Sequence, residues 1–551
     1  MTDIYEAFDE SRWFNWQQAA TPWLLSGCFD ACAQFFPSYF GIPFFTSVLY
    51  YRRVPALSSY QASWLLRYDE GVEVGRQLTD LLNNEGVGVN ILSAFEDSGE
   101  FFIQTRNNLY RSHGVTDLGP DALEALISDV VEHFNIFYGI GCITEPIQWF
   151  AEMEVQRTLL EDPGRWLGDS NISSWPRSRL NEALLHAGSS YTYHIHQDLV
   201  RILTLAKDHG IELASLSGIE KVDTSQSAVV DAIRDHLDAW GWKANNYARI
   251  SRLTIDDVIQ ELIELGDADL AANTLAEQAG RISALDHDSA ALLTELGDTT
   301  LAHIVRSGRN FGTALADRRK VIMNQALEVL SLVSQELCKV TGLPPRLAEF
   351  LTLGEAREAM RSTDPELWVD RLEDRENAYV QVLSTYQVGS DTMPEPAGFR
   401  PADLRTSSTV AAEGESAYRL LMVIDSAFGL LLRGRNLWPL KGQIAYAPAG
   451  LEPIVGTCRL VVDPREVDFQ DDEILVATST TPDFMPILRR ASAIVTDQRG
   501  LTTHAAIVAK ELQTPCIVGT IFATRAIRDG DTVRLVFKDG AGEVELVRAG
   551  E

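Results

Sequence analysis

The 551-residue sequence is short of basic side chains, because 47 lysines and arginines stand against 78 aspartates and glutamates, giving a formal net charge of −31. Nucleic acids and anionic membrane surfaces attract basic patches, so this balance argues against both kinds of partner. No uncharged apolar run reaches the roughly 18 residues that a membrane-spanning helix needs. The N-terminal residues also lack the basic and apolar regions of a signal peptide. We therefore expect a cytoplasmic protein.

Cysteines are few and scattered, and none forms a CxxC pair, so the sequence predicts no disulfide framework. Cys28 and Cys32 lie four residues apart in an apolar segment, which favours buried thiols over metal ligands. The sequence also lacks a GxxxxGK[ST] loop and a GxGxxG between a strand and a helix. We expect no tight ATP binding by this chain alone.

The N-terminal three quarters divide into three predicted segments. Residues 1–120 are rich in aromatic side chains and prolines, and Phe101–Thr105 reads as a strand. Residues 121–388 are predicted to be helical and to bind the substrate, and their best apolar face is formed by Ile322, Ala326, Val329, Leu330, Val333 and Leu337. Residues 389–437 are predicted to be a linker, rich in Pro, Ser and Thr as far as Glu413, with a short helix over Ala417–Leu432.

Residues 438–551 change to short β runs with one helix, Ala505–Leu512. The runs are Thr457–Val462, Ile474–Thr478, Ala493–Thr496, Cys516–Val518, Val533–Phe537 and Val544–Val547. The predicted fold class is therefore mixed: a mainly α-helical N-terminal region followed by a C-terminal α/β domain.

One segment of this last domain is suited to phosphate chemistry. Residues 493–512 read as a buried strand, a turn at Gly500, a cap at Thr502 and Thr503, and a helix whose first turn contains His504. Free backbone N–H groups and the helix dipole hold a phosphate at such a position and disfavour the imidazolium form. A neutral imidazole is a nucleophile for phosphorus. From these residues alone, a phosphate-accepting His504 and a merely structural one are equally supported.

This segment, continued through Thr514–Thr520, resembles the mobile phosphohistidine domain of the phosphoenolpyruvate-utilising family. That family includes phosphoenolpyruvate synthase, pyruvate phosphate dikinase, rifampin phosphotransferase and the large subunit of phenylphosphate synthase. The resemblance covers about residues 438–548 and includes Leu440–Ala445, Ile474–Ala477, Thr481–Asp483, Ala523–Thr524 and Asp529–Asp531. It implies that the whole domain swivels while His504 carries a phosphoryl group between two sites.

Two residues depart from the family pattern or vary within it. Arg499 replaces the first of two glycines before the helix, and it is a candidate to contact the phosphate. Thr503 occupies a position where the family has Ser, Cys or Thr. The resemblance makes Thr502, Thr503, Gly500 and Arg499 the expected phosphate-supporting residues around His504.

A weaker resemblance covers residues 120–385, where Glu336–Cys338 and Leu351–Glu355 are similar to the helical substrate region of rifampin phosphotransferase. The ATP-grasp segment of these relatives is not recognised, and Arg306–Gly308 only superficially echoes it. Nor does a phosphoenolpyruvate-binding barrel follow the last domain. The resemblance to phenylphosphate synthase therefore implies a separate ATP-grasp-type subunit that supplies ATP and Mg²⁺, with no cofactor or metal held by this chain.

The leading hypothesis is thus one subunit of a split phosphotransferase, which moves phosphate from an ATP- or phosphoenolpyruvate-binding partner through His504 to a small molecule in the helical region. Residues 1–120 are expected to contribute to the acceptor site. Two alternatives stay open: a ligase component that activates a carboxylate, and a non-catalytic binding or regulatory protein. The intact Thr502-Thr503-His504 sequence argues against the last.

Other candidate residues are weaker. His194 and His196 alternate like metal ligands, but their flanks look helical and residues two apart do not share a helix face, so structural or substrate-pocket roles are favoured. His133 and Glu145 are candidates to line an acceptor pocket, although helix packing is favoured for both. A cluster of tryptophans is interpreted as core rather than as an aromatic pocket: Trp13, Trp16 and Trp23.

Overall fold

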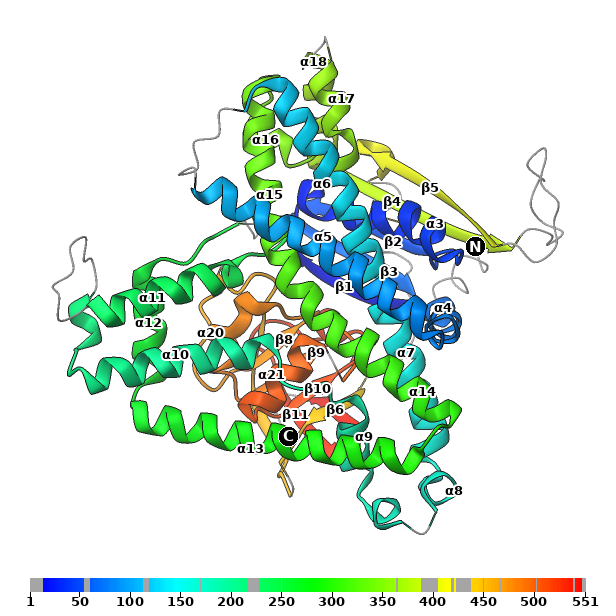
Figure 1. Ribbon diagram of the computed structural model, residues 1–551, viewed down its shortest axis with the longest axis vertical. Coiled ribbons are helices and arrows are strands. Elements are labelled where there is room, and N and C mark those ends of the chain that lie inside the picture. Colours follow the sequence, from blue (N-terminus) through cyan, green and yellow to red (C-terminus); the bar gives the residue numbers. More distant parts are fainter. Residues whose placement is uncertain are drawn as a thin grey trace.

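The computed structural model describes most of the chain, with gaps between the following ranges: 13–53, 60–111, 118–168, 170–216, 227–248, 250–362, 365–387, 405–417, 421–422, 438–448, 450–465, 467–501, 503–538 and 541–547. Figure 1 shows a C-terminal domain of strands lying against a larger helical body. This arrangement confirms a mixed fold at the level of its two parts.

An antiparallel five-stranded sheet lies at one end of the helical body. Its order is β1 (Trp13–Ala19), β3 (Tyr60–Arg67), β2 (Ser47–Arg53), β4 (Ala378–Gln387) and β5 (Arg405–Glu413). Strand β2 pairs with β4 in a register that sets Ser47 opposite Leu383. The N-terminal region and a segment more than 300 residues later therefore build one sheet.

Strand β5 corrects the prediction of a linker over residues 389–437. Residues 405–413 pair with β4 along their whole length, and Glu413 receives hydrogen bonds from Arg371 and Arg375. The Ser/Thr-rich composition that suggested a linker also suits an edge strand, because threonine and valine favour extended backbone. Residues 388–404 and most of the predicted helix Ala417–Leu432 lie outside the described residues.

The largest apolar core joins α2 (Pro22–Asp30), α5 (Glu85–Arg111), α6 (Pro120–Gly141) and α15 (Leu315–Thr341) to the sheet. The predicted strand Phe101–Thr105 is wrong, because these residues belong to α5. Phe95 and Phe102 are both fully buried on one side of this helix, seven residues apart, which is a helical spacing. The predicted helical face around Ile322 is confirmed in α15, which ends at Gly342 in the left-handed conformation.

A continuous helical run from Pro120 to Leu160 is long and apolar enough to span a membrane by length and composition. However, 56% of its most apolar window is buried inside the protein, and Phe134 and Phe137 are core residues. A core helix passes the same test of length and composition.

The remaining helices of the body surround this core and the C-terminal domain (Figure 1). They are η2 (Ala31–Phe35), α3 (Phe36–Phe40), α4 (Tyr68–Leu82), α7 (Thr144–Val155), η3 (Gln156–Leu160), α8 (Pro163–Leu167), η4 (Asn171–Ser174), α9 (Arg177–Leu185), α10 (Tyr191–Asp208), η5 (Leu213–Leu216), α11 (Ser227–Trp240), η6 (Gly241–Ala244), α12 (Ile255–Leu265), α13 (Ala268–Leu296), α14 (Thr300–Ser307), η7 (Gly308–Ala314), α16 (Pro345–Ala348), η8 (Leu353–Glu355), α17 (Ala356–Arg361) and α18 (Pro365–Asn377).

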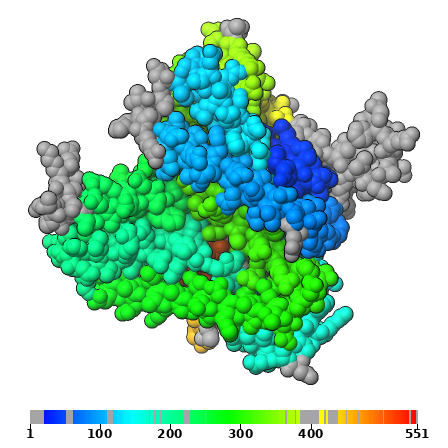
Figure 2. Space-filling model, in the orientation of Figure 1, coloured from blue at the N-terminus to red at the C-terminus, as the bar shows by residue number. Residues whose placement is uncertain are grey.

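The C-terminal domain is a closed barrel in the order β10-β6-β12-β11-β7-β8-β9. Its strands are β6 (Leu440–Tyr446), β7 (Ile454–Leu460), β8 (Ile474–Ala477), β9 (Ala493–Thr496), β10 (Cys516–Val518), β11 (Thr532–Lys538) and β12 (Ala541–Leu546). Its helices are η9 (Pro482–Phe484), α20 (Met485–Leu488), α21 (His504–Leu512) and α22 (Ala523–Ala526). Strands β7 to β10 are parallel neighbours, so the loops after β8 and β9 emerge at one end of the barrel. In the view of Figure 2, the helical body hides almost all of this domain.

Candidate functional site

His504 is the first residue of α21, at the end of the barrel where β8 and β9 finish. Thr503 caps this helix, because its hydroxyl accepts a hydrogen bond from the backbone N–H of Ala506. Gly500 has a φ of 114°, which favours glycine, and an added Cβ there would lie 3.4 Å from Nε2 of Gln148. The strand, turn, cap and helix predicted from sequence are therefore present, while Thr502 lies outside the described residues.

The imidazole of His504 is buried, with 5% of its surface exposed. Its Nδ1 lies 2.8 Å from the hydroxyl of Thr480, whereas its buried Nε2 has no hydrogen-bond partner in the described part of the chain. When Nδ1–H donates to Thr480, Nε2 carries the free lone pair. Burial, and secondarily the charge of Lys320, hold the pKa of His504 well below its ordinary value. The ring is therefore neutral and nucleophilic at neutral pH.

Thr480 was not singled out from the sequence. It follows β8 in the run Thr478–Thr481, at the same end of the barrel as His504. A polar run at the carboxyl end of a parallel strand was the available signal.

A cavity of about 170 Å³ lies between this end of the barrel and the helical body. The barrel contributes Thr480, Thr481, Gln498, Arg499, Thr503 and His504 to its wall. The body contributes apolar and aromatic side chains, which include Leu25, Phe44, Phe45, Trp64, Leu66, Trp149, Met323 and Leu327. The first five of these side chains belong to residues 1–120, which we expected to contribute to the acceptor site.

The polar part of the wall is cationic beside His504. Arg319 donates to Oε2 of Glu145 at 2.9 Å and to the carbonyl of Gly141 at 2.7 Å. Burial raises the pKa of Glu145, but Arg319 more than offsets this and the pKa stays below its ordinary value. Arg319 is thus already paired. Glu145 lines the cavity, which corrects the favoured assignment of this residue to helix packing alone.

Lys320 and Arg499 are the other two cations of the cavity wall. Within the described ranges, no carboxylate forms an ion pair with either of them, and the Arg499 guanidinium lies 5.7 Å from the ring centre of Tyr68. Burial lowers the pKa of both groups, and for Lys320 the charges of nearby carboxylates, Asp317 first among them, only partly offset this. An anionic group on His504 therefore has two available cations nearby.

The His504 face of the barrel is docked on the body by specific contacts. Nδ2 of Asn246 donates to Asp483 at 2.9 Å, Glu152 accepts from the backbone N–H of Leu501 at 3.3 Å, and Glu511 accepts from Thr192 at 2.7 Å. Apolar residues of both parts share one cluster, which includes Val155, Leu159, Leu301, Leu501, Ala505 and Ala506. His504 is therefore enclosed by the domain contact.

Two glutamates make this contact sensitive to pH. Burial raises the pKa of both Glu152 and Glu511 from 4.5 to about 7. Each glutamate then favours the docked form most below about pH 4.5, and this contribution is lost as pH rises through about 7. The buried His504 acts in the opposite direction, because its lowered pKa disfavours docking below its ordinary value of 6.5. We expect the radius of gyration, measured by small-angle scattering, to increase as pH rises from about 6.5 through about 7.

Glu511→Gln should reduce that increase, because an uncharged side chain removes one of the two titrations. The matched control is Glu543→Gln, a more exposed position in the same domain. A radius that rises equally with pH in wild type and Glu511→Gln would contradict the assignment of this glutamate.

Four other candidate residues do not line the cavity: His133, Trp23, His194 and His196. His133 stacks on Phe101 with ring centres 4.1 Å apart, and Trp23 is a core residue whose indole donates to the carbonyl of Leu330. His194 and His196 lie within α10, as their flanks predicted, and no group of three or more metal-ligating side chains occurs in the described ranges. Trp13 and Trp16 lie on β1, but their side chains are outside what the structure describes.

Comparison with known proteins gives the relatives of this domain. Residues 469–540 match the family described as PEP-utilising enzyme, mobile domain. Phosphoenolpyruvate synthase of Pyrococcus furiosus is 49% identical over 93 residues, which are 16% of this chain and 11% of that protein. A probable phosphoenolpyruvate synthase of Archaeoglobus fulgidus is 42% identical over 96 residues, 17% of this chain and 13% of that protein. The predicted resemblance to the phosphoenolpyruvate-utilising family is confirmed.

Another relative matches well beyond the C-terminal domain. Rifampicin phosphotransferase of Streptomyces sviceus is 24% identical over 458 residues, which cover 78% of this chain and 47% of that protein. The matched part thus spans less than half the length of these curated relatives.

Proposed function

We propose that this chain is a phosphotransferase component in which His504 receives a phosphoryl group and passes it to a small hydroxyl compound bound in the adjoining cavity. The observation that carries the proposal is the buried Nε2 of His504. It has no hydrogen-bond partner in the described part of the chain, and its ring forms part of the cavity wall. Buried polar atoms nearly always have a hydrogen-bond partner. A buried nucleophilic nitrogen without one, beside a cavity, therefore supports a role in binding or reacting with a group that enters the cavity.

The transfer is a displacement at phosphorus. The bond from Nε2 of His504 to phosphorus breaks while the acceptor oxygen forms a bond to phosphorus, and the proton of the acceptor hydroxyl is released to solvent. Lys320 and Arg499 offset the negative charge on the phosphoryl oxygens, and Thr480 keeps the proton on Nδ1 so that the leaving imidazole is neutral.

Cavity size limits the acceptor. A dry engineered cavity of about 150 Å³ holds one benzene molecule. At about 170 Å³, with a mostly apolar body wall, this cavity suits a hydroxyl compound of about one ring. The aromatic side chains Phe44, Phe45 and Trp149 supply flat surfaces for such a ring.

His504 receives its phosphoryl group in a different position of the barrel domain from the docked one. With 5% of its surface exposed, His504 is out of reach of a nucleotide on another polypeptide while the domain is docked. We therefore propose that the domain swivels away to be charged by an ATP-grasp-type partner that supplies ATP and Mg²⁺. The names of the relatives, phosphoenolpyruvate synthase and rifampicin phosphotransferase, support phosphoryl transfer as the class of reaction.

The proposal can be tested without the partner by using potassium phosphoramidate as a small phosphoryl donor to histidine. Peptide mapping should place an acid-labile phosphoryl group on His504, and adding single-ring alcohols or phenols should remove it as the phosphate ester. Label confined to other histidines would contradict the proposal.

In the same assay, Lys320→Gln should slow transfer from phosphorylated His504 by about 10²-fold, the usual cost of removing one preorganised electrostatic contact. The phosphoryl group should still appear on His504. Lys339→Gln is the matched control, because Lys339 lies on the same helix α15 with a more exposed side chain paired to Glu336. Equal transfer rates in the two variants would remove Lys320 from the mechanism.

A further inference from the structure

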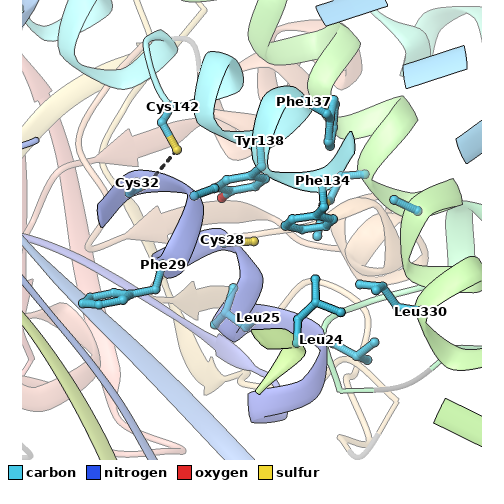
Figure 3. Close-up of a cluster of buried hydrophobic side chains, with 14 of the residues drawn as sticks. Leu24, Leu25, Cys28, Phe29, Cys32, Phe134, Phe137, Tyr138, Cys142 and Leu330 are labelled. Carbon is cyan, nitrogen blue, oxygen red and sulfur yellow. Dashed lines mark hydrogen bonds between the residues drawn. The ribbon is translucent and has the colours of Figure 1, made fainter. Parts of the chain in front are cut away.

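Two cysteines meet in the wall of the acceptor cavity. Sγ of Cys32 lies 2.7 Å from Sγ of Cys142, although 110 residues separate them in the chain. Figure 3 shows this contact as a dashed line between Cys142 and Cys32, which belong to different helical segments. Cys32 is fully buried and Cys142 is 4% exposed, and both residues contribute to the cavity wall.

The packing that brings them together depends on a glycine. Cys32 lies in η2, a short π-helical stretch that continues α2, and Cys142 follows the last residue of α6. An added Cβ on Gly139 of α6 would lie 2.3 Å from Cδ1 of Phe35 in η2, so only glycine permits this approach. Irregular π-helical turns of this kind are frequent at functional sites.

We propose that Cys32 and Cys142 form a reversible thiol–disulfide pair, oxidised by a small disulfide that enters the acceptor cavity. One cysteine thiolate attacks a sulfur of the small disulfide and releases one small thiol. The second cysteine thiolate then attacks the mixed disulfide and releases the other. Two electrons and two protons pass from the pair to the oxidant, and no further reactant is needed.

The geometry favours this pair over other combinations of cysteines. A disulfide bond is about 2.05 Å long, so the two sulfurs need only a small displacement. Among the described residues, this is the one pair of cysteines whose two sulfurs lie within hydrogen-bond distance of each other. Cys28 lies one helical turn before Cys32 and is also buried, which makes it a natural control.

Access to the pair depends on the barrel domain. Thr480, Thr503 and His504 of the barrel line the same cavity as the two cysteines, so a docked domain shields the thiols. Burial raises the pKa of Cys32, which further slows its reaction in that state. If the domain swivels, a step that rests on the proposed function, oxidation is faster in the separated form.

Oxidation should alter one half of the catalytic cycle. The disulfide would join η2 to the end of α6, so the part of the cavity wall that contains Cys32 and Cys142 could no longer move apart when an acceptor enters. We expect the KM for the acceptor to rise about tenfold, while phosphorylation of His504 is unchanged. This split between the two steps separates a cavity effect from a general loss of structure.

The direct test treats the full chain with 2-hydroxyethyl disulfide, followed by alkylation and mass spectrometry. Wild type and Cys28→Ser should lose two hydrogens and yield a linked peptide pair containing Cys32 and Cys142. Cys32→Ser and Cys142→Ser should yield no such pair. The same treatment of Glu511→Lys, designed to break the docking contact with Thr192, should proceed faster.

The proposal is overturned if Cys32 and Cys142 remain fully alkylated in both wild type and Glu511→Lys, while a small dithiol in the same solution is oxidised. A crosslink through Cys28 would equally contradict it. Failure of the proposed function gives a different result, because the disulfide would form although His504 never carried phosphate.

Discussion

His504→Ala should abolish formation of the phosphorylated protein and lower the rate of phosphoryl transfer by at least about 10⁴-fold. The reason is that Nε2 of His504 is the nucleophile, and no second histidine contributes to the described wall of the cavity. The fold should persist, because within the described residues the side chain has one hydrogen-bond partner, Thr480, and it lies at the start of a helix that Thr503 caps. Intact-mass measurement after treatment with phosphoramidate, with circular dichroism as a check on folding, decides the result.

The matched control for this variant is His303→Ala, which removes a half-exposed histidine of α14 that pairs with Asp298. It should carry the phosphoryl group on His504 and transfer it at the wild-type rate. A phosphoryl group that persists at the same stoichiometry in His504→Ala would place the chemistry on another residue.

Locking the barrel domain in its docked position should prevent His504 from being charged. Nδ2 of Asn246 donates to Asp483 at 2.9 Å between the two parts, so these are the positions that we would replace with cysteine to engineer a disulfide. The oxidised form should take up phosphate from phosphoramidate at least about tenfold more slowly than the same protein reduced, because the buried nitrogen is reached only after local opening. A Cys32→Ser background removes the native thiol pair from the comparison.

The reduced and oxidised forms of this variant have the same sequence, so any difference between them reports domain movement alone. Protein phosphorylated first and locked afterwards should still deliver one phosphoryl group, since His504 already lies beside the acceptor cavity. If the locked protein is charged as fast as the reduced protein, His504 works from a fixed position and the swivelling proposal is wrong.

The sequence located His504 because all of its local determinants lie within a few residues. The strand, the turn at Gly500 and the Thr503 cap each have a short-range signature, and α21 follows directly from them. The same holds for α15, whose apolar face repeats with a helical period and ends at a left-handed glycine.

The rest of the site could not be found in this way. Lys320 precedes His504 by 184 residues in the chain, and it lies in the same cavity only because α15 and the barrel pack together. Strand β5 was missed for a related reason, since its Ser/Thr-rich sequence becomes a strand through pairing with β4. Phe101–Thr105 was misread because four of these five residues are apolar or β-branched, and so short a run fits a strand as well as a helix.

The central claim is that Nε2 of His504 carries the phosphoryl group. It is tested most directly by nuclear magnetic resonance of the phosphorylated chain labelled with ¹⁵N at its histidines. We predict a single phosphorus–nitrogen coupling to Nε2 of His504, with Nδ1 still protonated beside Thr480. Coupling to Nδ1, or to a histidine other than His504, would contradict the account.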